Sequence, residues 1–217
     1  MSMTFTDRNN NPVNVEFEAD EQYLVRKYIP KDATVLEMGA RYGTVSCVLS
    51  QTLDDPTKHL AVEPDCTVIE ALIKNRDTNG GKFHIFEGVV SNKGYEMGYI
   101  DPKFDFYEYG TYTKETETPT IKNLSLESLS KEYDLNFDCI VADCEGFFCT
   151  FVEENPEAIK NMRVIIYEQD GTPWHEFTKK YDQLNITLEN YGFQRIHTIP
   201  HPDYENNPNL HNVWIKK

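Results

Sequence analysis

Thr34-Val-Leu-Glu-Met-Gly-Ala-Arg-Tyr-Gly-Thr-Val45 passes from a short apolar run into a glycine-containing turn and then into an apolar-periodic segment. This pattern predicts a strand over 34–38 and a helix over 44–53. A strand, a tight turn and a helix in this order open a nucleotide-binding α/β domain. The glycines let the backbone turn sharply and approach a ligand closely, and the start of the helix offers free N–H groups to that ligand.

The spacing in this turn is acid-x-Gly-x-x-x-Gly, with Glu37, Gly39 and Gly43 at the fixed positions. It differs from the Gly-x-Gly-x-x-Gly fingerprint of dinucleotide sites. An acid at the strand end suits a ligand that offers donors, such as an amino-acid ammonium group. The spacing resembles motif I of the class I S-adenosylmethionine-dependent methyltransferases, which implies cofactor contacts from Glu37, Gly39, Ala40, Tyr42 and Gly43. The alternative is a structural strand–turn–helix without a ligand.

The chain is strongly acidic, with a formal net charge of −15 over 217 residues. Lys and Arg must neutralise a nucleic-acid backbone or an anionic membrane, so this charge disfavours both partners. Hydrophobic residues make up 39% of the chain, which is enough for the core of a single domain of this length.

The cysteines predict reduced thiols in a cytoplasmic protein. Their number is odd and none forms a C-x-x-C pair, so we expect neither a disulfide framework nor a zinc site. They are Cys47, Cys66, Cys139, Cys144 and Cys149. Residues 1–8 contain no apolar run, so we expect no signal peptide, and no apolar stretch approaches the length of a membrane span.

Strands and helices are predicted in alternation, which indicates a parallel sheet with helices on both faces. The predicted strands are 34–38, 59–63, 82–87, 137–142, 164–167, 193–198 and 212–215. The predicted helices are 18–28, 44–53, 66–75, 125–133, 146–160 and 174–191. Only a loop joins the last two strands, so they should pair as an antiparallel hairpin at the sheet edge. The expected fold is the Rossmann-like, seven-stranded methyltransferase sheet over 34–217, preceded by an extension and a helix over 1–33.

Three further segments are expected around this sheet. A short strand is expected at 13–17, and 95–100 should form a peripheral hairpin with 104–109. The polar stretch 111–120 is expected to be a loop, either a lid over the substrate or a plain mobile loop.

Four of the predicted strands end in an acid. These acids are Glu37, Glu63, Asp143 and Glu168. Ligands of open α/β sheets bind at the carboxyl ends of the strands. Acids are costly to bury there without partners, so their repetition indicates a binding site.

Glu63 is the predicted partner of a ribose diol, because a carboxylate accepts from two hydroxyls at once. Pro64 and Asp65 would line the adenine side. The alternative is an exposed Glu63 that caps the next helix. Three residues after the following strand are expected to offer backbone amides to the adenine edge: Gly88, Val89 and Ser91.

Later segments resemble the FkbM family of methyltransferases. The resemblance is carried by 126–130, by 137–146 with its Asp-x-Glu-Gly motif, and by 164–168, and the segments 62–65 and 89–91 also fit. It implies S-adenosylmethionine-dependent methyl transfer, usually to oxygen, with sugar and glycan hydroxyls as frequent acceptors. Many members carry a Lys just before the acidic motif, where this chain has Val141 and Ala142.

The methyl group of a sulfonium is already activated, so positioning supplies much of the rate. A sugar hydroxyl still needs a base, a metal or both as its proton leaves. A resemblance to metal-dependent sugar methyltransferases implies that Asp143, Glu168 and Asp170 hold Mg²⁺ and that Glu145 is the base, and hard oxygen ligands suit this ion. Without a metal, Glu145 would cap the following helix and Glu168 would contact the acceptor. Asp143 is also expected beside the cofactor, and His175 is a further base candidate.

The sequence as a whole predicts a cytoplasmic S-adenosylmethionine-dependent O-methyltransferase that acts on a sugar or glycan hydroxyl. A methyltransferase of a small non-sugar metabolite and a non-catalytic module with the same fold are the alternatives. The loops 92–120 and 200–211 would shape the acceptor pocket, but they encode neither the identity of the acceptor nor the oligomeric state.

Overall fold

The computed structural model describes residues 3–16, 18–99, 111–169, 175–200 and 211–217, with the backbone alone for 175–179. The predicted strand over 104–109 and Asp170 therefore lie outside the described residues. None of the five cysteines, all of which lie in the described ranges, forms a disulfide. Within the described ranges, no helix has both the length and the apolar character that a membrane span requires.

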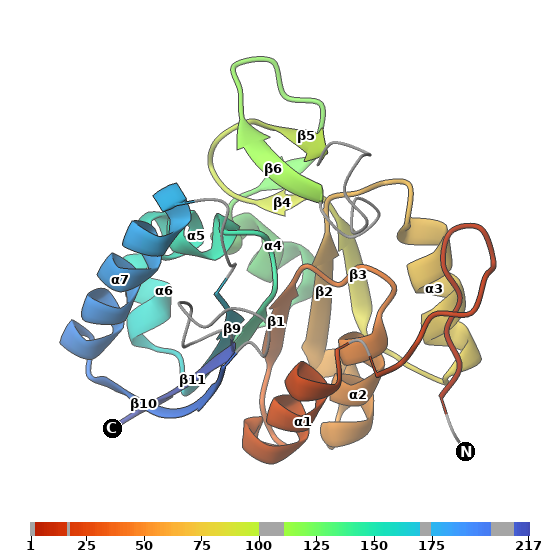
Figure 1. Ribbon diagram of the computed structural model, residues 1–217, viewed down its shortest axis with the longest axis horizontal. Coiled ribbons are helices and arrows are strands. Elements are labelled where there is room, and N and C mark those ends of the chain that lie inside the picture. The colour runs from red at the N-terminus through yellow and green to blue at the C-terminus, as the bar shows by residue number, and fades with distance from the viewer. Residues whose placement is uncertain (1–2, 17, 100–110, 170–174, 201–210) are drawn as a thin grey trace.

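Seven strands form one sheet in the order β10-β11-β9-β8-β1-β2-β3 (Figure 1). The strands from β3 to β9 in this order run parallel, whereas β11 is antiparallel to both of its neighbours. This confirms the predicted, mostly parallel sheet with a C-terminal antiparallel hairpin. The strands are β1 (Val35–Met38), β2 (His59–Glu63), β3 (His84–Glu87), β8 (Cys139–Ala142), β9 (Val164–Glu168), β10 (Phe193–Ile199) and β11 (His211–Lys216).

Helices cover both faces of the sheet (Figure 1). One face carries α1 (Ala19–Tyr28), α2 (Thr44–Thr52) and α3 (Ile69–Thr78), and a short 3-10 helix, η1 (Pro56–Lys58), precedes β2. The other face carries α4 (Leu126–Tyr133), α5 (Phe147–Glu154), α6 (Pro156–Lys160) and α7 (His175–Asn190). The central strands are buried along their whole length, as expected of parallel strands that are covered on both sides.

Alternate residues of each strand face different cores. Leu36 and Ile140 pack with Phe148 of α5 on one side of the sheet. Val35 and Val141 lie in the other core, which α1 and α2 complete. Successive side chains of a strand point to opposite faces, so strands that are covered on both sides appear in the sequence as continuous apolar runs.

The N-terminal segment also contributes to the core. Phe5 is buried in a cluster with Ala61 of β2 and Leu72 of α3. Leu24 and Val25 of α1 are fully buried against the sheet. The extension and helix predicted over 1–33 therefore share the core of the segment that follows.

The predicted strand over 13–17 is wrong in its described part, 13–16. The chain leading to it is held in a turn, in which the Asp7 carboxylate accepts the amides of Asn9 and Asn11, both at 2.8 Å. Bonds of this kind from a side chain to the nearby backbone compete with strand pairing.

A peripheral hairpin pairs β5 (Tyr95–Tyr99) with β6 (Thr111–Glu115) in antiparallel register. The predicted loop over 111–120 is therefore wrong for its first half, and the partner of β5 is β6 rather than 104–109. β6 begins Thr-Tyr-Thr, and β-branched and aromatic residues favour strands. A further short parallel pair consists of β4 (Val89–Val90) and β7 (Asn123–Leu124).

The turn after β1 lies directly against the turn after β8. The Gly39 amide donates to the Val62 carbonyl, and the Asp143 amide donates to the Met38 carbonyl, both at 3.0 Å. Gly39 has a φ of +91°, and a Cβ placed on it would lie 1.6 Å from the Asp143 carbonyl oxygen. The contact between these two turns therefore requires glycine here, whether or not a ligand binds.

Gly39→Ala is expected to destabilise the protein by about 3 kcal/mol or more, because the overlap with Asp143 can be relieved only by moving backbone. Gly80→Ala is the matched control. Gly80 has a φ of +69°, but no atom lies within 4 Å of an added Cβ. Its expected cost is about 1 kcal/mol, from the left-handed conformation alone. Urea denaturation measures both variants, and equal losses would contradict the steric explanation.

Candidate functional site

The carboxyl ends of β1, β2, β8 and β9 meet at one edge of the sheet, as their parallel registers require. The chain leaves β1 toward β2 on one side and leaves β8 toward β9 on the other. Ligands of open α/β sheets bind in the crevice at such a topological switch point. The turns that follow these strands therefore make up the candidate site.

Glu37 lies in the interior between sheet and helices. The residue is 2% exposed, and its Oε2 lies 2.9 Å from Nε2 of the fully buried His59. Burial and the charge of Glu37 raise the pKa of the nearby Cys47 thiol to about 12. Sequence reasoning missed His59, although its position in a strand beside β1 is a usable signal. Contact of Glu37 with an ammonium group stays a prediction.

The other turn residues predicted to touch the cofactor are packed within the fold. Ala40 and Tyr42 are buried, and the Tyr42 side chain packs against Ala71 of α3. A Cβ on Gly43 would lie 2.6 Å from the Leu72 side chain, also on α3. The glycine motif therefore holds α2 and α3 together, independently of anything that it binds.

Thr44 begins α2 and was not singled out from the sequence. The residue is 3% exposed, and its hydroxyl has no hydrogen-bond partner in the described part of the chain. The preceding N-cap residue, Gly43, provides no side-chain cap. Buried polar atoms nearly always have a partner. The Thr44 hydroxyl is therefore a candidate contact for a polar ligand group.

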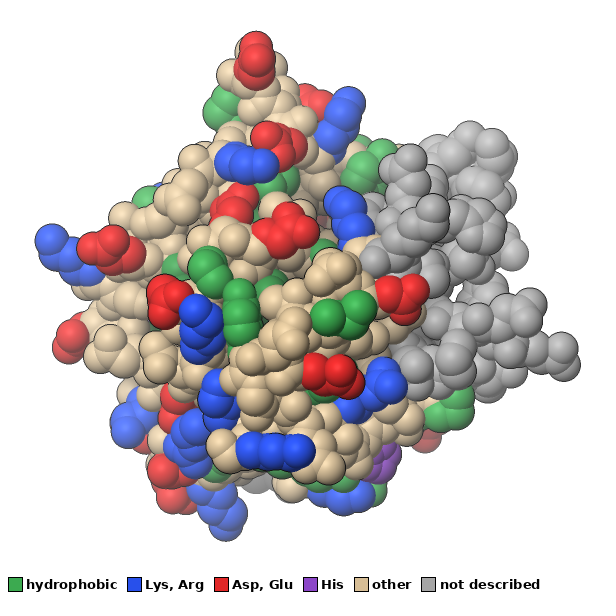
Figure 2. Space-filling view, turned by 90° about the vertical axis from the view of Figure 1, so that its left-hand side faces the viewer, with side chains coloured by type: hydrophobic (Ala, Val, Ile, Leu, Met, Phe, Trp, Pro, Cys, Tyr) green, Lys and Arg blue, Asp and Glu red, His purple; other side chains and the backbone are tan. Residues whose placement is uncertain are grey.

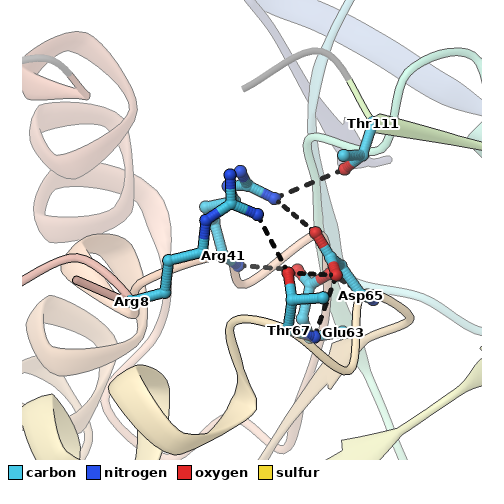
Figure 3. A network of polar contacts seen from close by, with 6 residues as sticks. All are labelled: Arg8, Arg41, Glu63, Asp65, Thr67 and Thr111. Atoms are coloured by element: carbon cyan, nitrogen blue, oxygen red, sulfur yellow. Dashed lines mark hydrogen bonds and ion pairs between the residues drawn. The ribbon is translucent and has the colours of Figure 1, made fainter. Parts of the chain in front are cut away.

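The carboxylate of Glu63 is buried at the end of β2 and organises the turn that follows (Figure 3). Its two oxygens accept the backbone amides of Arg41 and Asp65, both at 2.8 Å, and Pro64 is half-buried beside it. Each carboxylate oxygen has a second acceptor position, so both can still accept from a ligand hydroxyl. Burial raises the pKa of Glu63 to about 7, against the effects of the two amides and of the Arg41 charge. The alternative of an exposed, helix-capping Glu63 is wrong, because α3 follows Val68 without a side-chain cap.

An ion pair closes the same turn. Arg41 Nη1 lies 3.0 Å from Oδ2 of the fully buried Asp65 and 3.4 Å from Oγ1 of Thr111 in β6. Asp65 Oδ1 accepts the amide and hydroxyl of Thr67, and the Thr67 hydroxyl accepts from Arg8 at 3.1 Å. The N-terminal segment and the β5–β6 hairpin thus both reach the predicted adenine side (Figure 3). Sequence reasoning missed Arg41, which occupies a variable position of the glycine motif.

The residues predicted to offer amides to adenine are engaged within the fold. The Gly88 amide donates to the Glu63 carbonyl at 2.9 Å, whereas the amides of Val89 and Ser91 donate to the Lys122 and Leu124 carbonyls at 2.9 and 2.8 Å, because 89–91 pairs with the segment around β7. The Ser91 hydroxyl donates to Oε2 of Glu154 at 2.7 Å. This corrects the prediction that these amides are free donors for adenine.

The turn after β8 carries Asp143 and Glu145, both partly exposed. Glu145 has a φ of +50° and Gly146 a φ of +81°, immediately before α5 begins. A non-glycine residue in the left-handed region costs roughly 1 kcal/mol, and such strain concentrates at functional sites. Gly146 is the N-cap of α5 and has no side chain of its own with which to cap the helix. The alternative role of Glu145 as a helix cap stays a prediction.

Of the three predicted metal ligands, the structure describes Asp143 and Glu168 but not Asp170. Glu168 ends β9, and its Oε2 lies 3.5 Å from Nε2 of His211 on β11. Over the ranges that the structure describes, no three His, Cys, Asp or Glu side chains form a group that could hold a metal ion. Asp170 lies outside those ranges, so a magnesium site of Asp143, Glu168 and Asp170 stays a prediction. His175 begins α7, where the backbone alone is described.

Two acids at the start of α1 extend the site beyond the predicted motifs. Glu21 is only 4% exposed. Burial, together with the charges of Asp143 and Glu37, raises the pKa of Glu18 to about 8 and that of Glu21 well above its ordinary value. Sequence reasoning missed both, because acids in the first turn of a helix are usually exposed residues that favour the helix dipole.

No family model and no curated protein matches the chain. Solved structures do match it. A putative O-methyltransferase from Klebsiella pneumoniae is 13% identical, with a TM-score of 0.52, over 92% of this chain and 80% of that chain. The O-methyltransferase from Bacillus cereus in complex with SAH is 14% identical, with a TM-score of 0.54, over 94% and 82%. A precorrin-6y C5,15-methyltransferase from Geobacter metallireducens is 14% identical, with a TM-score of 0.54, over 93% and 87%.

These similarities concern the fold. The resemblance to the FkbM family rests on the sequence motifs, since no family model matches. The matches cover nine-tenths of this chain or more, so they include its seven-stranded sheet. The chain has the Rossmann-like α/β fold of the class I methyltransferases.

Proposed function

We propose that this chain is an S-adenosylmethionine-dependent methyltransferase that methylates a hydroxyl of a sugar or glycan. The observation that carries the proposal is the meeting of three turns at the switch point. These are the Gly39 turn, the turn held by the buried Glu63, and the turn in which Glu145 is left-handed. The fold adds support, because the solved structures that share it include O-methyltransferases, one of them in complex with SAH.

The turn after β2 suits the ribose of this cofactor. S-adenosylmethionine supplies a methyl group that its sulfonium has already activated. Two amides hold the Glu63 carboxylate in place before any ligand binds. A preorganised acceptor loses little conformational freedom on binding. Asp65 lies on the adenine side in this proposal, and the backbone of 39–43 passes beneath the ligand.

Glu145 is the proposed base. An acceptor hydroxyl must lose its proton as the methyl group arrives, and Glu145 lies at the end of a strand that flanks the switch point. It lies in the turn between β8 and α5, and its backbone there is left-handed. Asp143 lies beside the Gly39 turn, and His175 is the second candidate base, at the start of α7.

The proposed acceptor is an uncharged carbohydrate. A net charge of −15 disfavours a polyanion, although a putative tRNA methyltransferase shares the fold. On the face in Figure 2, Lys and Arg side chains are mixed with Asp and Glu. The β5–β6 hairpin is tied to Arg41 through Thr111, so it borders the site and is placed to shape the acceptor pocket.

The resemblance to FkbM motifs favours a sugar over a small non-sugar metabolite. Identification of the methylated product distinguishes these two acceptors. A non-catalytic binding module with this fold would bind the cofactor but would show no turnover with any acceptor.

S-adenosylhomocysteine is expected to bind with micromolar affinity, about −8 kcal/mol. Glu63→Gln should weaken this binding by about tenfold or more, because a donor replaces one acceptor for the ribose diol. Glu87→Gln is the matched control, since Glu87 is the exposed register partner of Glu63 on β3. Isothermal titration calorimetry measures all three proteins. Equal affinities in the two variants would rule out the proposed role of Glu63.

The pKa of about 7 for Glu63 predicts pH-dependent binding. Only the carboxylate accepts both ribose hydroxyls, and protonation removes it as the pH falls through 7. The affinity for 5′-methylthioadenosine, which has the ribose but no amino-acid group, should fall by about tenfold per pH unit below about pH 6. Glu63→Gln should bind weakly with no such slope. A flat profile for the wild-type protein would count against this site.

Glu145→Gln is expected to reduce turnover by about 100-fold or more, since general base catalysis is lost. Its affinity for S-adenosylhomocysteine should stay unchanged. Glu153→Gln, an exposed position on α5, is the control that should keep full turnover. Release of S-adenosylhomocysteine from S-adenosylmethionine with a panel of sugars measures the effect. Full turnover in Glu145→Gln would exclude Glu145 as the base. A requirement of wild-type turnover for Mg²⁺ would support the predicted metal site.

A further inference from the structure

Two asparagine side chains at the C-terminal end of α3 hold the N-terminal segment of the chain, which lies beside this helix (Figure 1). The side-chain amide of Asn79 donates to the Thr4 carbonyl at 2.9 Å, and its oxygen accepts the Thr4 amide at 3.0 Å. Asn75, one turn earlier, holds Thr6 in the same way, at 2.8 Å and 2.9 Å. A primary amide offers an acceptor and two donors, so each asparagine satisfies both backbone groups of one residue, as a neighbouring strand would.

The same segment is also fixed on its other side. The Val13 amide donates to the Phe5 carbonyl at 3.0 Å, and Thr6 forms an antiparallel bridge with Pro12. Phe5 itself is 4% exposed and lies in a buried apolar cluster. Residues 4–13, which we call the N-terminal strap, are therefore anchored in the core and paired along both edges.

Asn75 connects this strap to the Gly39 turn. One hydrogen of its side-chain NH₂ group is donated to the Thr6 carbonyl, and the other is donated to the Tyr42 carbonyl at 2.9 Å. Asn75 is 2% exposed, so both bonds lie in the interior, where hydrogen bonds are electrostatically stronger than in water. The corresponding second hydrogen of Asn79 is donated to the Asn75 carbonyl at 2.8 Å, within the end of α3.

A second connection joins the strap to the turn after β2 (Figure 3). Arg8 Nη1 donates to the Thr67 hydroxyl at 3.1 Å, and this hydroxyl donates to Oδ1 of the buried Asp65 at 2.7 Å. The strap thus reaches both turns of the proposed cofactor site, the Gly39 turn through Asn75 and the turn after β2 through Arg8.

We propose that Asn75 is a positioning residue that couples the docking of the N-terminal strap to the geometry of the Gly39 turn. This inference rests on the proposed function, in which that turn passes beneath the cofactor. The amide and carbonyl of Thr6 fix the orientation of the Asn75 side chain, and this orientation directs its second N–H at the Tyr42 carbonyl. When the strap leaves α3, the Asn75 amide is free to rotate, and the turn loses a bond that preorganises it for the ligand.

Coupling of this kind is reciprocal. If the docked strap raises the affinity of the site for the cofactor, the bound cofactor must stabilise the docked strap by the same factor. A residue that contributes only to folding stability lacks this property, because its loss does not change how the ligand acts on the strap. The effect of the ligand on the strap therefore separates a positioning role from a purely structural one.

Asn75→Ala should weaken the binding of S-adenosylhomocysteine by about tenfold, within the usual range of coupling between two sites. Asn79→Ala is the matched control, because it removes the bonds to Thr4. It leaves Asn75 bound to Thr6 and Tyr42, so the affinity should stay unchanged. Isothermal titration calorimetry measures both variants at a temperature at which thermal unfolding shows them to be folded. Equal affinities in the two variants would overturn the proposal.

Hydrogen exchange of the Thr6 amide, which Asn75 accepts, reports the docking of the strap directly. In the wild-type protein, saturating S-adenosylhomocysteine should slow this exchange by about tenfold, because the coupling is reciprocal. In Asn75→Ala the Thr6 amide should exchange faster, and the ligand should no longer slow it. If the ligand binds the wild-type protein but leaves the Thr6 exchange unchanged, the coupling is wrong and the proposed function stands.

If the wild-type protein does not bind S-adenosylhomocysteine, the proposed function fails and the coupling fails with it. If Asn75→Ala does not fold, the affinity comparison is made with Thr6→Pro, which removes the amide that orients Asn75. Thr4→Pro is then the control, since it removes the corresponding amide at Asn79. The expected and contrary results are the same as for the first pair of variants.

Discussion

The structure depends on the contact between the turn after β1 and the turn after β8. With a side chain at Gly39, the Asp143 carbonyl could not occupy its position, and the two strand ends would have to separate. The contact at Gly39 also fixes the positions of residues further along both turns. The amide of Arg41, two residues after Gly39, holds the Glu63 carboxylate, while Glu145 follows Asp143 by two residues. The proposed ribose partner and the proposed base are thus positioned by one backbone-to-backbone contact at the place where the strand order reverses.

The buried carboxyl groups of the site differ in how their desolvation is compensated. Glu63 has two backbone amides, and Glu37 has the imidazole of His59. Glu21 has neither, and its charged neighbours are acids. Where the protein itself supplies the partners of a buried polar group, the stability of the fold explains them. A buried polar group without such partners indicates a partner outside the protein. This distinction separates the structural acids of the sheet from the candidate binding acids, although all of them occur near strand ends.

Much of the fold was predictable because strands covered on both sides form short apolar runs, such as the one before Asp143, with helical patterns between them. The pairing of β5 with β6 was not, because eleven residues separate the two strands and 104–109 also alternates. At the site, Glu63 was recognisable from its place at a strand end. Arg41 and Glu21 were not, since sequence periodicity does not reveal that a charged residue is buried or which distant acid it meets.

The position of β11 has a consequence for biosynthesis. This strand follows β10 along the chain, yet it lies between β9 and β10 and pairs with both. During translation β9 and β10 therefore emerge before the strand that joins them, and the hydrogen-bonding edge of β9 stays open until residues 211–216 have left the ribosome. An open strand edge is prone to pair with other chains. The nascent protein thus passes through a stage at which it is susceptible to aggregation, and a stop codon or ribosome stall shortly before His211 would leave it at that stage.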